Sequence, residues 1–491
     1  MATAASVRPV ANATGTTTGT TRDSARLIKA AICVVVTTAV YIIPPPDGLE
    51  PQAMHMLAIF LGTILGLILQ PLPTSAVAII GLSVAMITGT MDPKTAAFSG
   101  LGSASIWLIV AAFFIAQGFV KTGLGRRIAL VFISMLGKST LGISYGLSAA
   151  DLLLAPATPS NTARLGGILF PIITSISDVQ GSTPENDESR RRIGAYLAVT
   201  ANNVNAITSA MFVTSMAAGP VVVQLAADSG VTIGWGTWAL AGIVPGVLCL
   251  LVIPALVYKV YPPTIKHVPS AQTDARAELK QLGRLSMPEW IMAATFVAML
   301  VMWATGSMTG INATTVAFVG VSVLLATNII TWQDMAANKS AWSTLIFFGV
   351  LVGMATPLNE LGVTEWAGGM IARATTGMPW MVVLALLTVC YFLLHYMFAA
   401  ELAQAVALYT LFLGVAVAAG APPIASALML GCATGLIGAM THYASGPAAL
   451  IYGAGYLKTP EFLRIGFLCG IVTVAVWLTV GMGWWKIIGL W

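Results

Sequence analysis

Long apolar segments follow one another along most of this 491-residue chain, and they restrict it to a fold that crosses a membrane. A helix needs about 20 apolar residues to cross the hydrocarbon core of a bilayer, and about a dozen segments approach that length. Only 8% of the residues are charged, whereas a soluble domain carries roughly 25%. Because lipid offers the backbone no hydrogen-bond partners, each crossing segment must satisfy its own backbone groups. We therefore predict an all-α polytopic membrane protein.

The apolar segments form two sets of similar size, separated by one long hydrophilic stretch. Residues 1–26 are rich in Ala, Thr, Gly and Ser, and we interpret them as a disordered tail. We expect a first membrane repeat over 27–258, a charged cytoplasmic connector over 259–286 and a second membrane repeat over 287–491. The individual spans are placed at 27–43, 54–70, 74–90, 106–120, 128–136, 140–157, 193–213, 235–258, 290–305, 314–330, 345–354, 379–398, 403–419, 423–440 and 465–484.

Basic residues gather in the short loops, as they do on the cytoplasmic side of membrane proteins. Arg22, Arg26 and Lys29 precede the first span, so we expect the N-terminus in the cytoplasm. The net charge of +5 requires no nucleic-acid partner, and the connector is interpreted as a solvated link. We expect a bacterial inner membrane; a plastid inner envelope is the alternative, because transit peptides can also be Ser/Thr-rich and poor in acidic residues.

One apolar region, residues 152–171, contains a polar interruption and reads LLLAPATPSNTARLGGILFP. Pro156 and Pro159 remove helical donors, and each restricts the residue before it. Broken backbone at membrane depth is tolerated only where it is buried in protein or lines a cavity. The freed carbonyls, the polar side chains of 160–162 and the positive end of the restarting helix would together hold a small anion.

Segments of the two halves resemble each other. LIVAAFFIAQGFVKTGLG at 108–125 matches LIFFGVLVGMATPLNELG at 345–362, and MFVTSMAAGP at 211–220 matches GAMTHYASGP at 438–447. Kinked helices packed through small residues are common in membranes and are the simpler explanation for a single interruption. Matched interruptions in both halves instead indicate the binding site of a secondary transporter.

The motifs APATPSNTARLGG and THYASGPAALIYGAGY make the chain resemble the divalent anion/sodium symporter family over residues 30–491. It is most similar to the branch of 2-oxoglutarate/malate translocators and tartrate/succinate/citrate exchangers. The resemblance implies two inverted repeats, about eleven membrane helices and two re-entrant hairpins. The hairpins would span about 106–125 and 343–362, which include the matched segments 108–125 and 345–362. It also implies a homodimer of scaffold and transport domains that works as an elevator.

By the same resemblance, the first Ser-Asn-Thr motif and two glycine-proline turns would form the site. Ser160 and Asn161 would help to bind sodium where sodium is used, and Asn161 and Thr162 would hold a substrate carboxylate. The turns at 217–220 and 444–447 would close the site with backbone groups. The remaining substrate-binding candidates are Thr214, Gly219, Pro220, Thr441, Ser445, Gly446 and Pro447.

The second Ser-Asn-Thr copy departs from the family pattern, because Ala400, Glu401 and Leu402 stand where polar residues are expected. Two unit charges 4 Å apart interact by about 4 kcal/mol at an effective dielectric of 20, so an ionised Glu401 would repel a dianion. Glu401 is therefore protonated during transport, paired with a cation, or turned away from the substrate. We interpret it as a substrate-binding and coupling residue; a carboxyl hydrogen-bonded to backbone at a helix break is the alternative.

Three further polar residues in the apolar segments each have two possible roles. Asp151 is expected to be structural and to pair with a basic residue; a functional role, the usual hypothesis for an ionisable residue within the membrane, is the alternative. Arg164 would either clamp a carboxylate with its planar guanidinium or serve a structural or gating role, which we favour. His442 would pack beside the second glycine-proline turn or donate a hydrogen bond to the substrate.

We conclude that the chain is a secondary transporter of small organic anions, and the malate, succinate, 2-oxoglutarate, tartrate and citrate class fits best. The lost second motif favours exchange, and sodium- or proton-coupled symport is the alternative. An anion channel is disfavoured because no rings of charge appear, and no enzyme motif is present. Five cysteines without CxxC spacing and four scattered histidines predict no metal site. We expect no cofactor other than a coupling sodium ion or proton.

Overall fold

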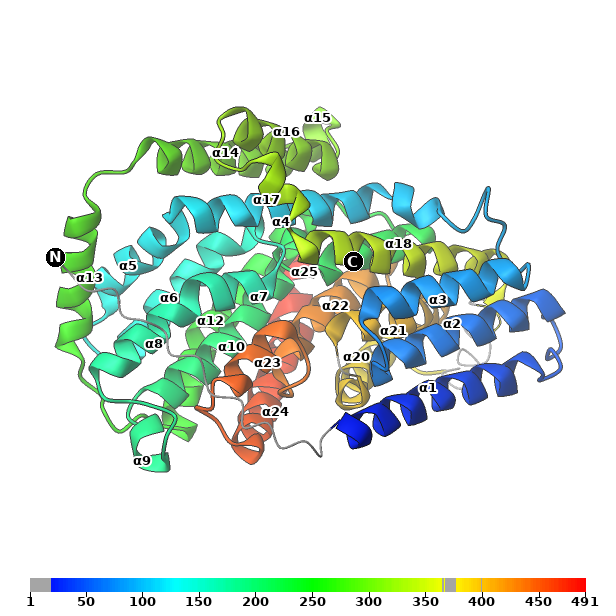
Figure 1. Ribbon diagram of the computed structural model, residues 1–491, viewed down its shortest axis with the longest axis horizontal. Helices are drawn as coiled ribbons and strands as arrows, with labels where there is room; N and C mark the ends of the chain where they lie inside the picture. The colour runs from blue at the N-terminus through cyan, green and yellow to red at the C-terminus, as the bar shows by residue number, and fades with distance from the viewer. Residues whose placement is uncertain (1–18, 364–365, 367–376, 399) are drawn as a thin grey trace.

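The computed structural model describes residues 19–363, 366, 377–398 and 400–491, and these residues contain helices but no β-strand (Figure 1). Eight of the described helices are long and apolar enough to cross a membrane. Shorter apolar helices at Thr74–Ile87, Ala313–Ala326 and Pro423–Ala439 account for three further expected spans. The predicted all-α polytopic fold is confirmed.

A first group of helices surrounds α4. It consists of α1 (Gly19–Tyr41), α2 (Pro51–Leu69), α3 (Thr74–Ile87), α4 (Ala104–Thr122), α14 (Met287–Ala304), α16 (Ala313–Ala326) and α18 (Lys339–Glu360). The helices α16, α18 and α14 pack against α4, and α18 continues onto α2 and α3. In Figure 1 the blue helices α1 to α3 lie beside α18 at one side of the molecule.

A second group is built around α10 (Gly194–Met211), all 18 residues of which are buried. It also contains α6 (Thr140–Leu154), α12 (Trp235–Val260), α20 (Trp380–Leu394), α21 (Glu401–Ala418), α22 (Pro423–Leu436) and α24 (Thr459–Val476). The helix α10 packs against α6, α12 and α22. Helices hydrophobic on every side belong in a core, yet α10 also buries three asparagines. Asn203 donates to the Val199 carbonyl and Asn205 to Asp151, whereas the Asn202 side chain has no partner among the described residues.

Two helix pairs reverse direction inside the second group. The first runs from α6 through η2 (Ala155–Ala157) into α7 (Asn161–Arg164), η3 (Leu165–Leu169) and α8 (Phe170–Val179). The second runs from α20 through η5 (His395–Met397) into α21. We call these the first and second hairpins. The Ser-Asn-Thr motif and its altered counterpart thus lie at the hairpin tips.

The hairpin positions expected from the resemblance were wrong. Residues 108–125 lie mainly within α4, and 345–360 within α18; both are continuous helices. The glycine turn at the end of the first segment does not fold that segment back on itself, and most residues after Gly362 lie outside the described part of the chain. Gly123 adopts a left-handed φ of 76° and ends α4, after which α5 (Leu124–Leu136) begins directly. In the first hairpin the chain reverses instead where Pro156, Pro159 and the Ser160 cap interrupt the helix, whereas α21 of the second hairpin begins after Ala400, which provides no side-chain cap.

Two broken helices complete the second group. The first continues from α10 through η4 (Val213–Ser215) into α11 (Ala218–Asp228), and the second from α22 through η6 (Ile437–Ala439) into α23 (Gly446–Gly453). Each half therefore shows the same order of a long helix, a hairpin, a broken helix and a second long helix. The hydropathy pattern missed α8, α11 and α23 as spans because each is only a short arm of an interrupted helix.

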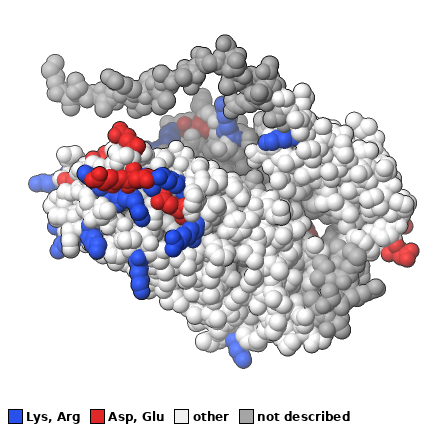
Figure 2. Space-filling view, turned by 90° about the horizontal axis from the view of Figure 1, so that it is seen from below, with Lys and Arg blue, Asp and Glu red and all other residues white. Residues whose placement is uncertain are grey.

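The charged connector is more ordered than a solvated link. Its helix α13 (Pro269–Leu282) packs on α5, with Ala271, Gln272 and Ala275 buried. The Gln272 side-chain amide donates to the Ser134 carbonyl at 2.8 Å. Figure 2 shows that most charged residues gather at one end of this view, and Figure 1 places α13 at that end. The remaining short helices are η1 (Ser99–Gly102), α9 (Asp187–Arg190), α15 (Gly306–Thr309), α17 (Trp332–Ala336), η7 (Trp477–Gly481) and α25 (Met482–Ile487).

Candidate functional site

The tip of the first hairpin is a capped helix start in the protein interior. Ser160 is the N-cap of α7, and its hydroxyl accepts from the Ala163 amide at 3.1 Å. The side-chain oxygen of Asn161 accepts from the Thr162 amide at 2.9 Å. These bonds satisfy amides that a helix start leaves unpaired. They also fix the Asn161 side chain so that its NH₂ group points away from α7.

A buried arginine holds this tip in place. The Nε of Arg164 pairs with Asp151 Oδ1 at 2.8 Å, and both side chains are fully buried. Its Nη1 donates to the carbonyls of Thr158 at 2.9 Å and Ser215 at 2.8 Å. The two hydrogens of Nη2 reach the hydroxyls of Thr208 and Ser209, at 3.1 and 3.2 Å.

All five guanidinium donors are therefore used within the protein, so Arg164 is structural and does not clamp a carboxylate. The expected basic partner of Asp151 is Arg164. Asp151 also accepts from the Asn205 amide at 3.3 Å, which gives one of the buried asparagines of α10 its partner.

The two hairpin tips meet through Glu401. Its Oε1 accepts a hydrogen bond from Asn161 Nδ2 at 2.9 Å, across 240 positions of sequence. Its backbone amide donates to the Ala444 carbonyl at 3.0 Å, in the second broken helix. The residue is buried, with 8% of its surface exposed. Glu401 thus faces the first Ser-Asn-Thr motif.

The second oxygen of Glu401 has no hydrogen-bond partner among the described residues. None of the described Lys, Arg or His side chains forms an ion pair with it. A Cβ added to Gly438 would come within 2.5 Å of this oxygen, so the broken helix passes directly beside the carboxyl group. The site therefore holds one buried acceptor that is free for a proton, a cation or a water molecule.

The second glycine-proline turn closes against Thr162. Ser445 is the N-cap of α23; its hydroxyl accepts from the Ala448 amide at 3.3 Å and donates to the Gly438 carbonyl at 2.6 Å. A Cβ on Gly446 would lie 2.0 Å from Thr162 Oγ1, so only glycine fits. Pro447 follows as a buried residue of the first turn of α23. The helix starts of α7 and α23 thus converge on one place, beside Glu401.

The first glycine-proline turn lies on the other side of the first tip. Thr214 Oγ1 donates to the Pro156 carbonyl at 2.5 Å and accepts from Trp235 Nε1 at 3.0 Å. A Cβ on Gly219 would lie 2.0 Å from the Val213 carbonyl, which again requires glycine. Pro220 lines a separate cavity of about 720 Å³, together with Trp235.

The predicted residues thus form two sets. Asn161, Thr162, Glu401, Ser445 and Gly446 lie in direct contact, with Ser160 and Pro447 adjoining them in the chain. Thr214, Gly219 and Pro220 support the first tip from outside that set. Thr441 is fully buried and its hydroxyl lacks a partner among the described residues.

Two polar residues near the second tip were not anticipated from the sequence. His395 is fully buried in η5, and its Nδ1 lies 2.7 Å from Gln404 Oε1, while its Nε2 has no partner among the described residues. A histidine and a glutamine flanking the altered motif within apolar segments were the available signal. Each unpaired buried polar group costs about 1–3 kcal/mol, so unpaired atoms of His395, Glu401 and Thr441 indicate a place that a ligand or water completes.

His442 lies against aromatic rings. Its ring centroid is 4.4 Å from that of Tyr452 and 5.0 Å from that of Tyr443. Its buried Nδ1 has no partner among the described residues, so both packing and a hydrogen bond to the substrate stay predictions.

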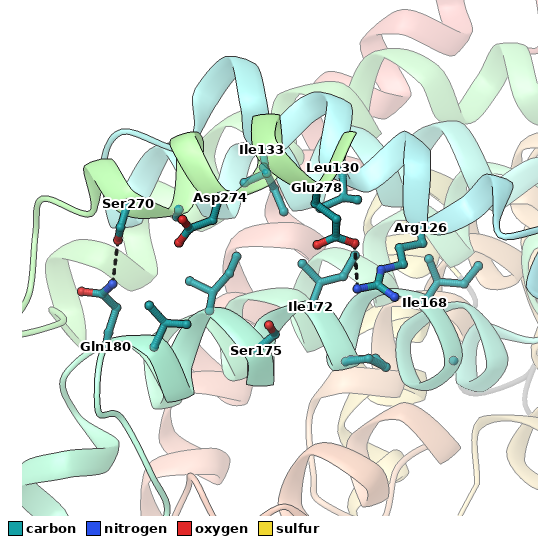
Figure 3. Close-up of a pocket in the computed structure, with 16 residues that line it drawn as sticks. Arg126, Leu130, Ile133, Ile168, Ile172, Ser175, Gln180, Ser270, Asp274 and Glu278 are labelled. Carbon is teal, nitrogen blue, oxygen red and sulfur yellow. Dashed lines mark hydrogen bonds and ion pairs between the residues drawn. The ribbon is translucent and has the colours of Figure 1, made fainter. Parts of the chain in front are cut away.

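A second, smaller cavity of about 250 Å³ lies between α5, α8 and α13, away from the predicted residues (Figure 3). Ile168, Ile172 and Ser175 line the side formed by the first hairpin, Ile133 and Asp274 lie opposite them, and a polar pair lies at each end. Arg126 pairs with Glu278 at 2.7 Å, and Gln180 donates to the Ser270 hydroxyl at 2.8 Å. The cavity separates the connector helix from the second arm of the first hairpin.

Comparison with known proteins places this arrangement among membrane transporters. Residues 24–491 match the profile of the family described as the sodium:sulfate symporter transmembrane region. The chain is 46% identical to "Putative malate transporter YflS" of Bacillus subtilis, covering 96% of this chain and 98% of that protein. It is 42% identical to dicarboxylate transporter 2, chloroplastic, of Spinacia oleracea, covering 96% and 84%.

Two further matches extend the comparison. A citrate/succinate antiporter of Escherichia coli K12 is 36% identical, with 93% of this chain and 97% of the antiporter covered. The crystal structure of the YdaH transporter of Alcanivorax borkumensis superposes with a TM-score of 0.55 at 12% identity, covering 96% of this chain and 98% of that one, and so shares the fold.

Proposed function

This chain belongs to the divalent anion/sodium symporter family, and on that premise we propose that it exchanges di- and tricarboxylates across a membrane by alternating access. It is a multi-pass membrane transporter and not an enzyme. The observation that carries the proposal is the contact between Asn161 and Glu401, which joins the tips of the two hairpins at the level of both broken helices. That point is where inverted-repeat transporters bind their substrates.

The substrate class follows from the chemistry of the site and from its relatives. The starts of α7 and α23 bring positive helix ends and hydroxyl groups to one place, which suits a carboxylate. The names of the relatives from Bacillus, spinach and Escherichia mention malate, dicarboxylates and citrate with succinate. We therefore extend carboxylates of four to six carbons to this chain, with Asn161 and Thr162 as the anion-holding residues.

Exchange is favoured because the second half of the site has lost its hydroxyl groups. Ala400 and Leu402 offer no oxygen ligand from their side chains, which weakens a second sodium site. Glu401 adds a carboxyl group that, when ionised, would repel an anion, because two unit charges 4 Å apart interact by about 4 kcal/mol at an effective dielectric of 20. We propose that Glu401 carries a proton or a cation while the anion is bound.

Uptake into proteoliposomes tests the exchange. Vesicles preloaded with unlabelled succinate or malate should take up labelled dicarboxylate at least ten times faster than empty vesicles, with or without sodium. Vesicles without protein provide the background. Uptake that depends strictly on sodium and ignores internal substrate would contradict exchange and support sodium symport.

Proton-coupled symport is the second candidate, and the unpaired Oε2 of Glu401 favours it. It predicts that an inward proton gradient drives accumulation into empty vesicles. The same vesicles distinguish the two mechanisms, because pure exchange does not accumulate substrate without an internal partner.

We also propose that the transporter works as a homodimer in a bacterial inner membrane. The bacterial relatives support this location, whereas the chloroplastic relatives keep a plastid inner envelope as the alternative. Membrane fractionation of the source cells and the mass of the detergent-purified protein by light scattering test the two statements. A monomeric mass at all detergent concentrations would contradict the homodimer.

A further inference from the structure

A column of three aromatic rings joins the two helix groups beside the first broken helix. Trp235, at the start of α12, stacks on Phe212 with ring centroids 6.0 Å apart and planes 21° apart. Its other face stacks on Trp303 of α14 at 5.6 Å and 20°. Trp303 is itself fixed, because its indole donates to the Ala313 carbonyl at 3.0 Å and only 3% of its surface is exposed.

The same tryptophan is linked to the first hairpin tip by two hydrogen bonds in series. Its Nε1 donates to Thr214 Oγ1 at 3.0 Å, and Thr214 Oγ1 donates to the Pro156 carbonyl at 2.5 Å. Pro156 lies in η2, four positions before Ser160, where the helix is broken. The indole can donate and cannot accept, so it fixes the direction of the Thr214 hydroxyl toward Pro156.

The two hydrogen bonds from Trp235 through Thr214 to Pro156, which we call the relay, lie beside the large cavity. Trp235, Trp303, Val213 and Pro220 all line that cavity of about 720 Å³, which lies at the starts of α4, α12 and α16 and the end of α14. Val213, the neighbour of Thr214 in the chain, therefore lies at the cavity wall, whereas Thr214 itself is buried with 1% of its surface exposed. Arg164 holds the tip at Thr158, and the relay from Trp235 through Thr214 holds it separately at Pro156.

We infer that Trp235 is a positioning residue for substrate binding, which sets the first hairpin tip through Thr214 and is itself oriented by the stack with Trp303. It acts on the anion only through the tip that carries Asn161 and Thr162. The inference rests on the proposed carboxylate transport, and the test below separates the failure of one from the failure of the other.

Trp235→Phe removes the donor and keeps an aromatic ring in the column. We expect it to raise the KM for dicarboxylate exchange about 3- to 10-fold, since a typical hydrogen bond contributes about 1 kcal/mol, while the maximal rate changes by less than twofold. Trp238→Phe is the matched control: this indole, one turn along α12, donates to the Ala210 carbonyl, and its loss should leave KM unchanged.

Thr214→Val and Thr214→Ser test the same hydrogen bonds while Trp235 stays unchanged. Valine should raise KM at least as much as Trp235→Phe, and serine, which keeps the hydroxyl, should restore it to within twofold. The double variant Trp235→Phe/Thr214→Val should be no worse than Thr214→Val alone, because both changes break one relay. Trp303→Ala should raise KM, whereas Trp303→Phe should not.

A merely structural role for Trp235 gives a different result. Equal losses of protein yield and maximal rate in the Trp235 and Trp238 variants with unchanged KM, or additive effects of the Trp235 and Thr214 variants, would overturn the inference while transport by the wild type stands. A wild-type protein that carries no carboxylate overturns the proposed function and this inference with it.

Discussion

At the scale of single residues, Glu401 is the main difference between this site and one with two intact Ser-Asn-Thr motifs. Sequence comparison of the two halves located it, because the lost motif and the new carboxyl group are visible in the printed chain. From the sequence, Glu401 could be protonated, paired with a cation or turned away from the substrate, and only the fold shows its hydrogen bond with Asn161. The position of Glu401 along its own helix does not reveal that its partner is Asn161, 240 residues earlier in the chain.

Glu401→Gln tests the coupling role with little change of shape. The glutamine carbonyl can still accept from Asn161, so the tips should remain joined while the titratable group is lost. We expect the pH dependence of exchange between pH 5.5 and 8 to fall to less than twofold, measured by initial uptake rates at saturating substrate. Glu360→Gln, at the exposed end of α18, is the control and should keep the wild-type profile. An unchanged profile in the Glu401 variant would remove Glu401 from coupling.

Asp151→Asn tests the buried arginine network. Breaking one partner of a buried ion pair leaves an uncompensated charge, which costs about 3–5 kcal/mol. We expect a fall of several degrees in the thermal unfolding midpoint of the detergent-purified protein. Arg126→Gln breaks the exposed pair with Glu278, where 62% and 33% of the side chains are accessible, and should shift the midpoint by less than one degree. Equal shifts would show that the network is not what holds the first tip.

At the scale of elements, the sequence predicted spans well and hairpins poorly. The spans at 54–70, 74–90 and 235–258 correspond to α2, α3 and α12 within a few residues, because lipid-facing helices need long apolar runs. The hairpins were assigned to segments that end in glycine. The first hairpin turns at Pro159 and the Ser160 cap, and the second turns where the Glu401 amide bonds to the Ala444 carbonyl of the second broken helix, a contact that the sequence does not reveal.

Glycine at the second turn is an element-scale requirement that can be tested. Gly446→Ala would place a methyl group 2.0 Å from Thr162 Oγ1 and force α23 away from α7. We expect at least a tenfold loss of exchange. Gly453→Ala is a matched control at the other end of the same helix, where a Cβ meets nothing within 4 Å, and it should retain wild-type rates. Retained exchange in the Gly446 variant would show that the α7–α23 contact is not needed for transport.

At the scale of the whole molecule, the connector that was expected to be solvated forms one unit with α5. Gln272 and Glu278 of α13 bond to Ser134 and Arg126 of α5. The sequence did not reveal this packing because charged residues dominate α13 and its buried face consists of only two alanines and a glutamine. The first hairpin, by contrast, faces α13 mostly across the cavity in Figure 3.

This difference predicts which contacts transport must break. If the hairpins move as a body past the connector, as an elevator requires, the bond between Gln180 and Ser270 has to open in each cycle, and the α5–α13 contacts can remain. In a background without the five native cysteines, oxidation of a Gln180→Cys/Ser270→Cys pair should therefore stop exchange, and reduction should restore it. The pair Ser134→Cys/Gln272→Cys should cross-link equally well and leave exchange above half of the reduced rate. Full exchange by the oxidised Gln180→Cys/Ser270→Cys protein, with its cross-link verified by mobility on a gel, would mean that the hairpin and α13 move together and that the site opens by some other motion.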